Sequence, residues 1–237
     1  MRLPTPDSPL PIRARSAGFT LTELLVVIGI IAVLAGLVFV VSRSVRERTD
    51  SARCLSNLRQ WQVALVAFAG DHDGETPRRG QGVRPVTNTA RPEDWFNALP
   101  PYAGLPSYAA LAQRGDRIKP GDGTIFACPS SKDTHAQCFL PYAMNMNISP
   151  TDRAHPHRLA EIVNPSRLVF LADAPGPYSS TLPAADAYSV KARHAGRANV
   201  VFMDGHAASF DAAYIGAGTG DPKRTDIQWD VAQEWTD

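Results

Sequence analysis

Apolar side chains dominate the stretch from Phe19 to Val41, which holds a single ionisable residue, Glu23, and no proline. About 20 consecutive apolar residues in a helix suffice to cross a hydrocarbon layer about 30 Å thick. A helix is expected there because lipid offers no hydrogen-bond partners to backbone groups. The pattern therefore predicts a transmembrane helix over residues 19–41. Inside a membrane the carboxylate of Glu23 costs on the order of 2.5–3.5 kcal/mol, so it indicates either a position near the interface or a charged partner.

The helical pattern continues past the apolar stretch, because no proline occurs between Phe19 and Pro77. Leucines then recur at helical spacing and form an apolar stripe. These leucines are Leu55, Leu58 and Leu65. We expect one continuous helix whose amphipathic part spans residues 42–74 and buries this stripe against a sheet. The turn-rich segment 71–74 predicts the end of the helix.

Patterns typical of strands appear in the C-terminal part of the chain. Residues 167–173 form a β-branched and aromatic run between two prolines. Residues 200–203 and 206–210 flank Asp204-Gly205, a strong two-residue hairpin signal. We also expect a short strand over residues 124–130. The chain is therefore predicted to be α+β, with a long N-terminal helix packed on a C-terminal antiparallel sheet and a globular domain over residues 75–237.

Composition adds an anchor and an orientation to this picture. The chain has 237 residues and a formal net charge of +1, which supports one soluble domain plus an anchor. The near-neutral balance argues against a nucleic-acid-binding surface. Residues 1–18 hold three arginines, one acidic residue and four prolines, and are predicted to be a basic leader that is removed. Positive charge before the span keeps this end in the cytoplasm, so the globular domain lies across the membrane.

Three cysteines are too few for a disulfide scaffold but allow one bridge and one free thiol. In an oxidising compartment Cys128 and Cys138 would close a small loop, and we favour this pair. Cys54, on the predicted helix, is the competing partner for either of them. The sequence does not choose among the three pairings.

The side chains best suited to metal binding or acid–base chemistry are those of His194, Asp204 and His206. A metal site and histidine–carboxylate acid–base chemistry are two interpretations, since histidine titrates near neutral pH. The third, which we favour, is structural: His194 bonds a loop, and Asp204 suits its turn. Two weaker metal candidates are the calcium-loop-like residues 71–75 and the histidines of the segment 155–157. We favour a solvated helix end for the first and an exposed proline loop for the second. We therefore expect no catalytic residue, no metal and no cofactor.

The segment Gly18-Phe19-Thr20-Leu21-Thr22-Glu23 and the apolar run behind it resemble the class III signal of type IV prepilins and type II secretion pseudopilins. The resemblance implies cleavage between Gly18 and Phe19 by a membrane aspartyl peptidase, the prepilin peptidase, and N-methylation of Phe19. It also implies that Glu23 pairs with the terminal amine of a neighbouring subunit. A pilin-like fold follows as an expectation. Thr22 stands where a larger aliphatic residue is commoner in the family.

A second resemblance concerns the C-terminal half. His194, Asp204 and Gly205 form a His-x9-Asp-Gly pattern that resembles a signature found with prepilin-type N-termini in large bacterial families, notably of planctomycetes. The segments 54–60, 126–130 and 142–145 also resemble elements of those proteins. This signature indicates a family but no known chemistry.

These features favour a structural subunit, a pseudopilin of a type II secretion-type pseudopilus. Its expected partners are the prepilin peptidase, the inner membrane, other pseudopilins and copies of itself, with the globular domain in the periplasm. The alternatives are a type IV pilus subunit, a single-pass anchored binding module and an anchored hydrolase. The binding module would use Trp95, Tyr102 and Tyr108, and the hydrolase would use His194 and Asp204.

Overall fold

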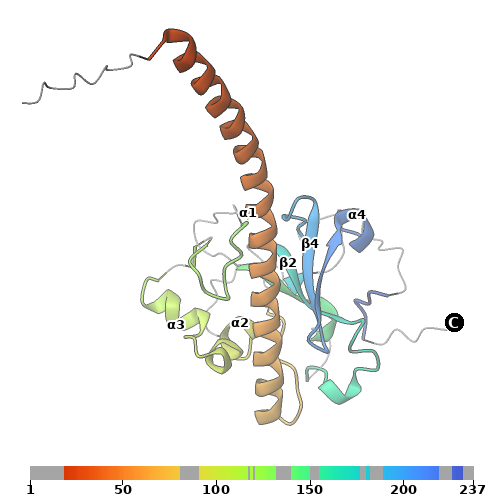
Figure 1. Cartoon of the computed structure of the whole chain (residues 1–237). Coiled ribbons are helices and arrows are strands. Elements are labelled where there is room, and N and C mark those ends of the chain that lie inside the picture. The colour runs from red at the N-terminus through yellow and green to blue at the C-terminus, as the bar shows by residue number, and fades with distance from the viewer. Residues whose placement is uncertain are drawn as a thin grey trace, which may run out of the picture. The chain divides into compact units, whose positions relative to one another are not determined.

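A computed structural model describes residues 19–80, 91–116, 118–119, 121–131, 140–149, 155–176, 180–181, 189–218 and 226–231. Its main helix, α1, runs from Leu21 to Asp71 (Figure 1). The chain divides into two compact units, Met1–Ser44 and Val45–Asp237, each of which is considered by itself. The predicted leader and Cys138 lie outside the described residues.

In the first unit, α1 presents apolar side chains that no other described part of the chain covers. Within the described residues, α1 is the one helix long and apolar enough to cross a membrane. Its apolar window is exposed, as expected if lipid surrounds it. The predicted helix is therefore present, and it continues into the polar half without a break.

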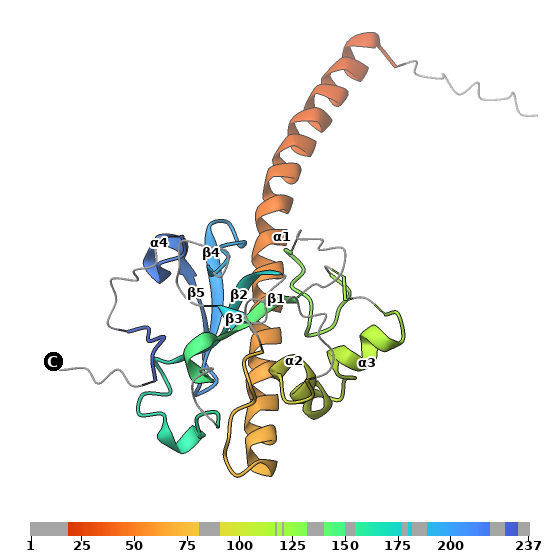
Figure 2. The ribbon, with the colours of Figure 1, turned by 180° about the vertical axis from the view of Figure 1, so that it is seen from behind.

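The second unit contains a five-stranded sheet with the order β3-β1-β2-β4-β5. The strands are β1 (Leu140–Asn145), β2 (Val169–Gly176), β3 (Ser180–Thr181), β4 (Arg197–Phe202) and β5 (Ala207–Asp211). The pairs β1–β2, β2–β4 and β4–β5 are antiparallel, whereas the short β3 pairs with β1 in parallel (Figure 2). The predicted α+β architecture, a long N-terminal helix with a C-terminal antiparallel sheet, is confirmed.

The predicted hairpin is formed by β4 and β5, with Val201 opposite Ala207. Its loop is longer than the two residues expected: residues 203–206 lie between the strands, and the N–H of Phe202 donates to the carbonyl of His206. The strand expected over residues 124–130 is wrong. That segment folds into consecutive turns, because the carboxylate of Asp122 accepts from the backbone and hydroxyl of Thr124 and starts a turn there.

Short helices complete the second unit. They are α2 (Trp95–Ala98), α3 (Tyr108–Gln113), α4 (Ala212–Ile215) and the 3-10 turns Pro100–Ala103, Met146–Ile148 and Leu159–Glu161. Helix α2 ends before Pro100, and the chain continues directly into a 3-10 turn that begins at that proline. Proline is tolerated there because the first turn of a helix leaves its N–H groups without helical partners.

The second half of α1 packs on one face of the sheet through a buried stripe at spacings of four and three residues. The stripe consists of Cys54, Leu58, Trp61, Leu65 and Phe68. It belongs to the same core cluster as Leu171, Val201 and Met203 of the sheet region. Leu55, which the leucine pattern placed in the stripe, is only half-buried, and Cys54 takes its place. A second cluster, including Phe202 and Trp229, covers the opposite face.

Trp61 organises the contact between α1 and the loops beside it. Its ring meets those of Trp95 and Phe126 edge to face, with centroids 5.3 and 5.1 Å apart. Its indole N–H donates to the carbonyl of Ile125 over 2.9 Å. Aromatic pairs of this geometry add about 0.5–1.5 kcal/mol beyond the area they bury. The segment 124–131 is therefore held against α1, which positions Cys128.

One buried carboxyl makes stability depend on pH. Asp94 precedes α2, and burial raises its pKa to about 6, although the guanidinium of Arg91 lowers it. The folded state therefore holds a proton more tightly than the unfolded state, whose pKa is near 3.8. The stabilisation that the protonated Asp94 carboxyl contributes is fully present below pH 3.8 and is lost as the pH rises through about 6.

Asp94→Asn is expected to flatten the pH profile in that window, because asparagine cannot ionise. The free energy of unfolding of the full chain in non-ionic detergent, followed by tryptophan fluorescence from pH 3.5 to 7 in denaturant, measures the effect. The difference in the free energy of unfolding between the wild type and the variant should change as the pH crosses this window. An unchanged difference would show that the carboxyl titrates alike in both states.

Candidate functional site

The motif residues at the N-terminus lie where α1 begins. Gly18 is outside the described residues, and Phe19 is 80 % exposed. Glu23 accepts hydrogen bonds from the N–H and the hydroxyl of Thr20, over 2.9 and 2.8 Å. The N–H of Glu23 donates back to the Thr20 hydroxyl over 3.2 Å. This reciprocal pattern is a capping box, and its Thr-x-x-Glu signal was present in the sequence.

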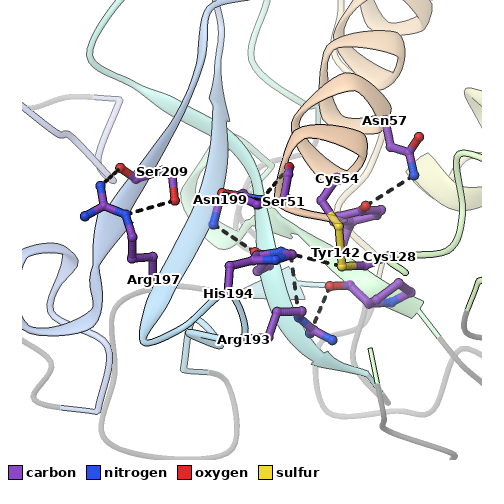
Figure 3. Close-up of polar contacts among 12 residues, drawn as sticks. Ser51, Cys54, Asn57, Cys128, Tyr142, Arg193, His194, Arg197, Asn199 and Ser209 are labelled. Atoms are coloured by element: carbon purple, nitrogen blue, oxygen red, sulfur yellow. Dashed lines mark hydrogen bonds and ion pairs between the residues drawn. A yellow bond between two sulfur atoms is a disulfide. The ribbon is translucent and has the colours of Figure 1, made fainter. Parts of the chain in front are cut away.

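A disulfide joins α1 to the loop beside it. Cys54 and Cys128 are bonded, with their Cα atoms 5.3 Å apart (Figure 3). This corrects the Cys128–Cys138 pairing that the sequence favoured: the sulfur of Cys128 is bonded to its competitor on the helix. The reason is tertiary, since the Trp61 contacts bring residues 124–131 against α1. The bridge closes a separation of 74 residues.

His194 lies beside this disulfide, in the interior of the second unit (Figure 3). A tight turn at Ala195-Gly196, where both residues have positive φ, pairs the backbones of His194 and Arg197. The turn directs the imidazole inward. Its Nε2 lies 3.6 Å from Sγ of Cys128 and 3.3 Å from Oδ2 of Asp173. Its Nδ1 has no hydrogen-bond partner within the described residues.

Asp173 is the centre of this buried polar cluster, and sequence analysis missed it. It lies in β2 and has no exposed surface. Its Oδ2 accepts from the N–H of Asn199 over 2.8 Å, and its Oδ1 lies 3.6 Å from Nε of Arg193. The side chain of Asn199 in turn donates to the carbonyl of Ser51 on α1. The signal in the sequence is an acidic residue directly after an apolar run; the predicted strand ends at this residue, whereas β2 continues to Gly176.

The cluster also affects a neighbouring phenol. Tyr142, on β1, is fully buried, and its hydroxyl accepts a hydrogen bond from the Asn57 amide over 3.4 Å. Burial, with the nearby Asp173 carboxylate, raises the pKa of this phenol far above its ordinary value. The hydroxyl therefore stays protonated at any physiological pH. It connects the sheet to α1 next to the disulfide.

Asp204 and Gly205 lie away from His194, because the strand β4 separates them. Asp204 is exposed, and its Oδ1 accepts from the N–H of His206 over 3.0 Å and lies 2.7 Å from that residue's Nδ1. The N–H of Asp204 donates to the carbonyl of Pro165. His194 and Asp204 therefore do not form one acid–base pair. The turn role favoured for Asp204 is consistent with these contacts.

Gly205 has φ +93°, and a Cβ built there would lie 3.2 Å from Oε1 of the buried Gln62. The Gln62 amide donates to the carbonyl of Met203 over 2.7 Å, so it holds the hairpin loop against α1. The glycine is thus required both for its backbone conformation and for the close approach of the helix.

Gly205→Ala is expected to destabilise the protein by about 1–3 kcal/mol, because it adds backbone strain and crowds Gln62. Gly218→Ala is the matched control: its φ is +81°, but nothing lies within 4 Å of its added Cβ. Chemical denaturation should show a larger loss for the first variant. Equal losses would mean that the contact with Gln62 contributes nothing.

The structure also places the aromatic residues proposed for a binding module and the two histidines of the segment 155–157. Trp95 and Tyr108, proposed for a binding module, are buried in the core and offer no binding surface. The hydroxyl of Tyr102 donates to Asp71 over 3.2 Å. His157 lies 3.0 Å from Glu161, and His155 lies 3.9 Å from Glu75. These two histidines therefore face separate carboxylates instead of sharing one.

Comparison with known proteins gives one result. The model of the prokaryotic N-terminal methylation motif matches residues 13–39, a range that includes Gly18, Phe19 and Glu23. No curated protein and no solved structure matches the chain. The motif supports a type IV pilin-like or pseudopilin protein and indicates a structural subunit. The motif implies processing by a prepilin peptidase and assembly into filaments, and the apolar helix fits a membrane anchor.

Proposed function

We propose that this chain is a pseudopilin, a subunit of a type II secretion-type pseudopilus. The observation that supports it most is the coincidence of the methylation motif with a helix that is apolar and uncovered in one half and packed on a sheet in the other. Cleavage between Gly18 and Phe19 would leave Phe19 as an N-methylated terminal residue. The apolar half then spans the inner membrane, and the globular domain lies in the periplasm.

Assembly follows from the exposed apolar half of α1. Its side chains have no partners in the described part of the chain, so they contact either lipid or another helix. The Glu23 carboxylate pairs with the terminal amine of Phe19 on a neighbouring subunit. Such a pair is favourable only when both charges are present, because either one alone is costly in a low-dielectric environment. The buried Cys54–Cys128 cluster keeps each globular domain attached to its own helix.

Mass spectrometry of the intact protein from its native membrane tests the processing step. The expected product begins at Phe19 and carries one added methyl group. The same chain produced in cells whose prepilin peptidase is inactive should keep residues 1–18. A full-length product in cells with the active peptidase would contradict the proposal.

A type IV pilus subunit is the alternative within the same class. Deleting the gene distinguishes the two: loss of secretion of folded periplasmic proteins, with surface filaments unchanged, is expected for a pseudopilin. Loss of surface filaments with normal secretion would identify a pilus subunit instead.

A further inference from the structure

Three potential metal ligands converge in the interior of the second unit. The sulfurs of Cys54 and Cys128 and a ring nitrogen of His194 all lie within 4.8 Å of one another, and all three residues are buried. They come from three separated parts of the chain: α1, the loop at residues 124–131 and the turn before β4. Oδ2 of Asp173 adds an oxygen 3.3 Å from Nε2 of His194.

The position of His194 is poorly explained by ordinary hydrogen bonding. Its Nε2 faces both a sulfur and a carboxylate oxygen. A neutral imidazole nitrogen carries either one proton or one lone pair, so it serves at most one of these neighbours well. A cation placed between the three groups would interact favourably with all of them.

Two of the separations agree with the edges of a tetrahedral site, whereas the two sulfurs, which are bonded to each other in this structure, have to move apart on reduction. Zinc–sulfur, zinc–nitrogen and zinc–oxygen bonds of about 2.3, 2.05 and 2.1 Å predict edges of about 3.6 Å between sulfur and nitrogen and about 3.4 Å between nitrogen and oxygen. The corresponding distances from Nε2 of His194 are 3.6 Å to Cys128 and 3.3 Å to Asp173. Two thiolates and an imidazole are ligands that zinc prefers.

The surroundings also suit the charge of such a site. Two thiolates, one carboxylate and a divalent cation sum to one negative charge. The guanidinium of Arg193 lies 3.6 Å from the other oxygen of Asp173 and supplies a compensating positive charge. The N–H of Asn199 donates to the proposed ligand oxygen of Asp173 and orients it, as outer-shell donors do in metal sites.

We propose that the dithiol form of this protein binds one zinc ion through Cys54, Cys128, His194 and Asp173. Each thiol gives up its proton on binding, the imidazole binds through Nε2 with its proton on Nδ1, and no electron is transferred. The same two sulfurs form the disulfide when they are oxidised, so the disulfide and the metal exclude each other. In either state α1 stays connected to the loop at residues 124–131 and to the sheet.

Zinc content of the full chain in detergent tests this directly. A phosphine reductant converts the disulfide into two thiols and is itself oxidised to the phosphine oxide, with water supplying the oxygen and both protons. The reduced protein is then incubated with zinc, passed through a desalting column and analysed for metal. A single bound ion is expected for the dithiol form, and none for the oxidised form. Cobalt(II) in place of zinc should give the thiolate charge-transfer and tetrahedral absorption bands.

Variants identify the ligands. His194→Gln keeps both cysteines, so its fold can be verified in the oxidised state before reduction. Loss of an outer-shell partner typically lowers metal affinity 10–100-fold. Because His194 is proposed as a direct ligand, the zinc affinity of this variant should fall by at least that much. Cys54→Ala should lose the ion, whereas Cys138→Ala, the matched cysteine control, should keep it. The proposal is overturned if the dithiol form retains no zinc. Full retention in His194→Gln, or loss in Cys138→Ala, overturns it equally.

Discussion

Replacing Glu23 with glutamine is expected to abolish filament assembly while the chain still inserts into the membrane. Glutamine keeps the shape of the side chain and removes its charge. In the capping box that Glu23 forms with Thr20, glutamine is an accepted substitute, so the start of α1 should survive. The proposed ion pair with the terminal amine of a neighbouring Phe19 cannot form. Breaking such a pair costs on the order of 3–5 kcal/mol per contact.

Thr20→Val is the matched control, because it removes the hydroxyl of the capping box and keeps the carboxylate. Filaments should still form in this variant. Sedimentation of sheared filaments measures assembly, and carbonate extraction of membranes measures insertion. Glu23→Ala, which loses both the charge and the cap, should also fail to assemble. If Glu23→Gln assembled normally and Thr20→Val did not, the acid would serve the helix start and the pairing role would be wrong.

Cys54→Ala should cause the largest loss of stability among the substitutions considered for the globular domain. The Cys54–Cys128 bridge closes a separation of 74 residues. Restricting a loop of that length in the unfolded chain contributes about 4 kcal/mol. For a domain of this size the midpoint of thermal unfolding should fall by roughly 8–16 °C. The variant also leaves a small cavity where Cys54, which is fully buried, packs in the core.

Thermal unfolding of the oxidised full chain in detergent, followed by circular dichroism, measures this effect. Cys138→Ala provides the control, and its unfolding midpoint should equal that of the wild type. Adding reductant to the wild type in the presence of a chelator should reproduce most of the loss. If Cys138→Ala were instead the destabilised variant, the pairing of Cys128 with Cys138 would be restored as the correct one.

Local patterns sufficed wherever neighbours in the sequence decide the conformation. The helix that became α1 was predictable because both its apolar run and its amphipathic stripe repeat at helical spacing. The β4–β5 hairpin was predictable because Asp204-Gly205 stands between two apolar runs. The processing motif is contiguous, so Gly18, Phe19 and Glu23 are recognisable without any fold.

Long-range packing decided the rest. The partner of Cys128 depended on Trp61 bringing a loop against α1, and no spacing along the chain encodes that contact. His194 met Asp173 instead of Asp204, since β4 places the two ends of the motif apart. Which distant residues come into contact depends on how side chains pack throughout the domain. The energy of that packing is the sum of many individually weak contacts. For that reason the methylation motif could be found in the linear chain, and the buried cysteine–histidine–aspartate cluster appeared only after folding.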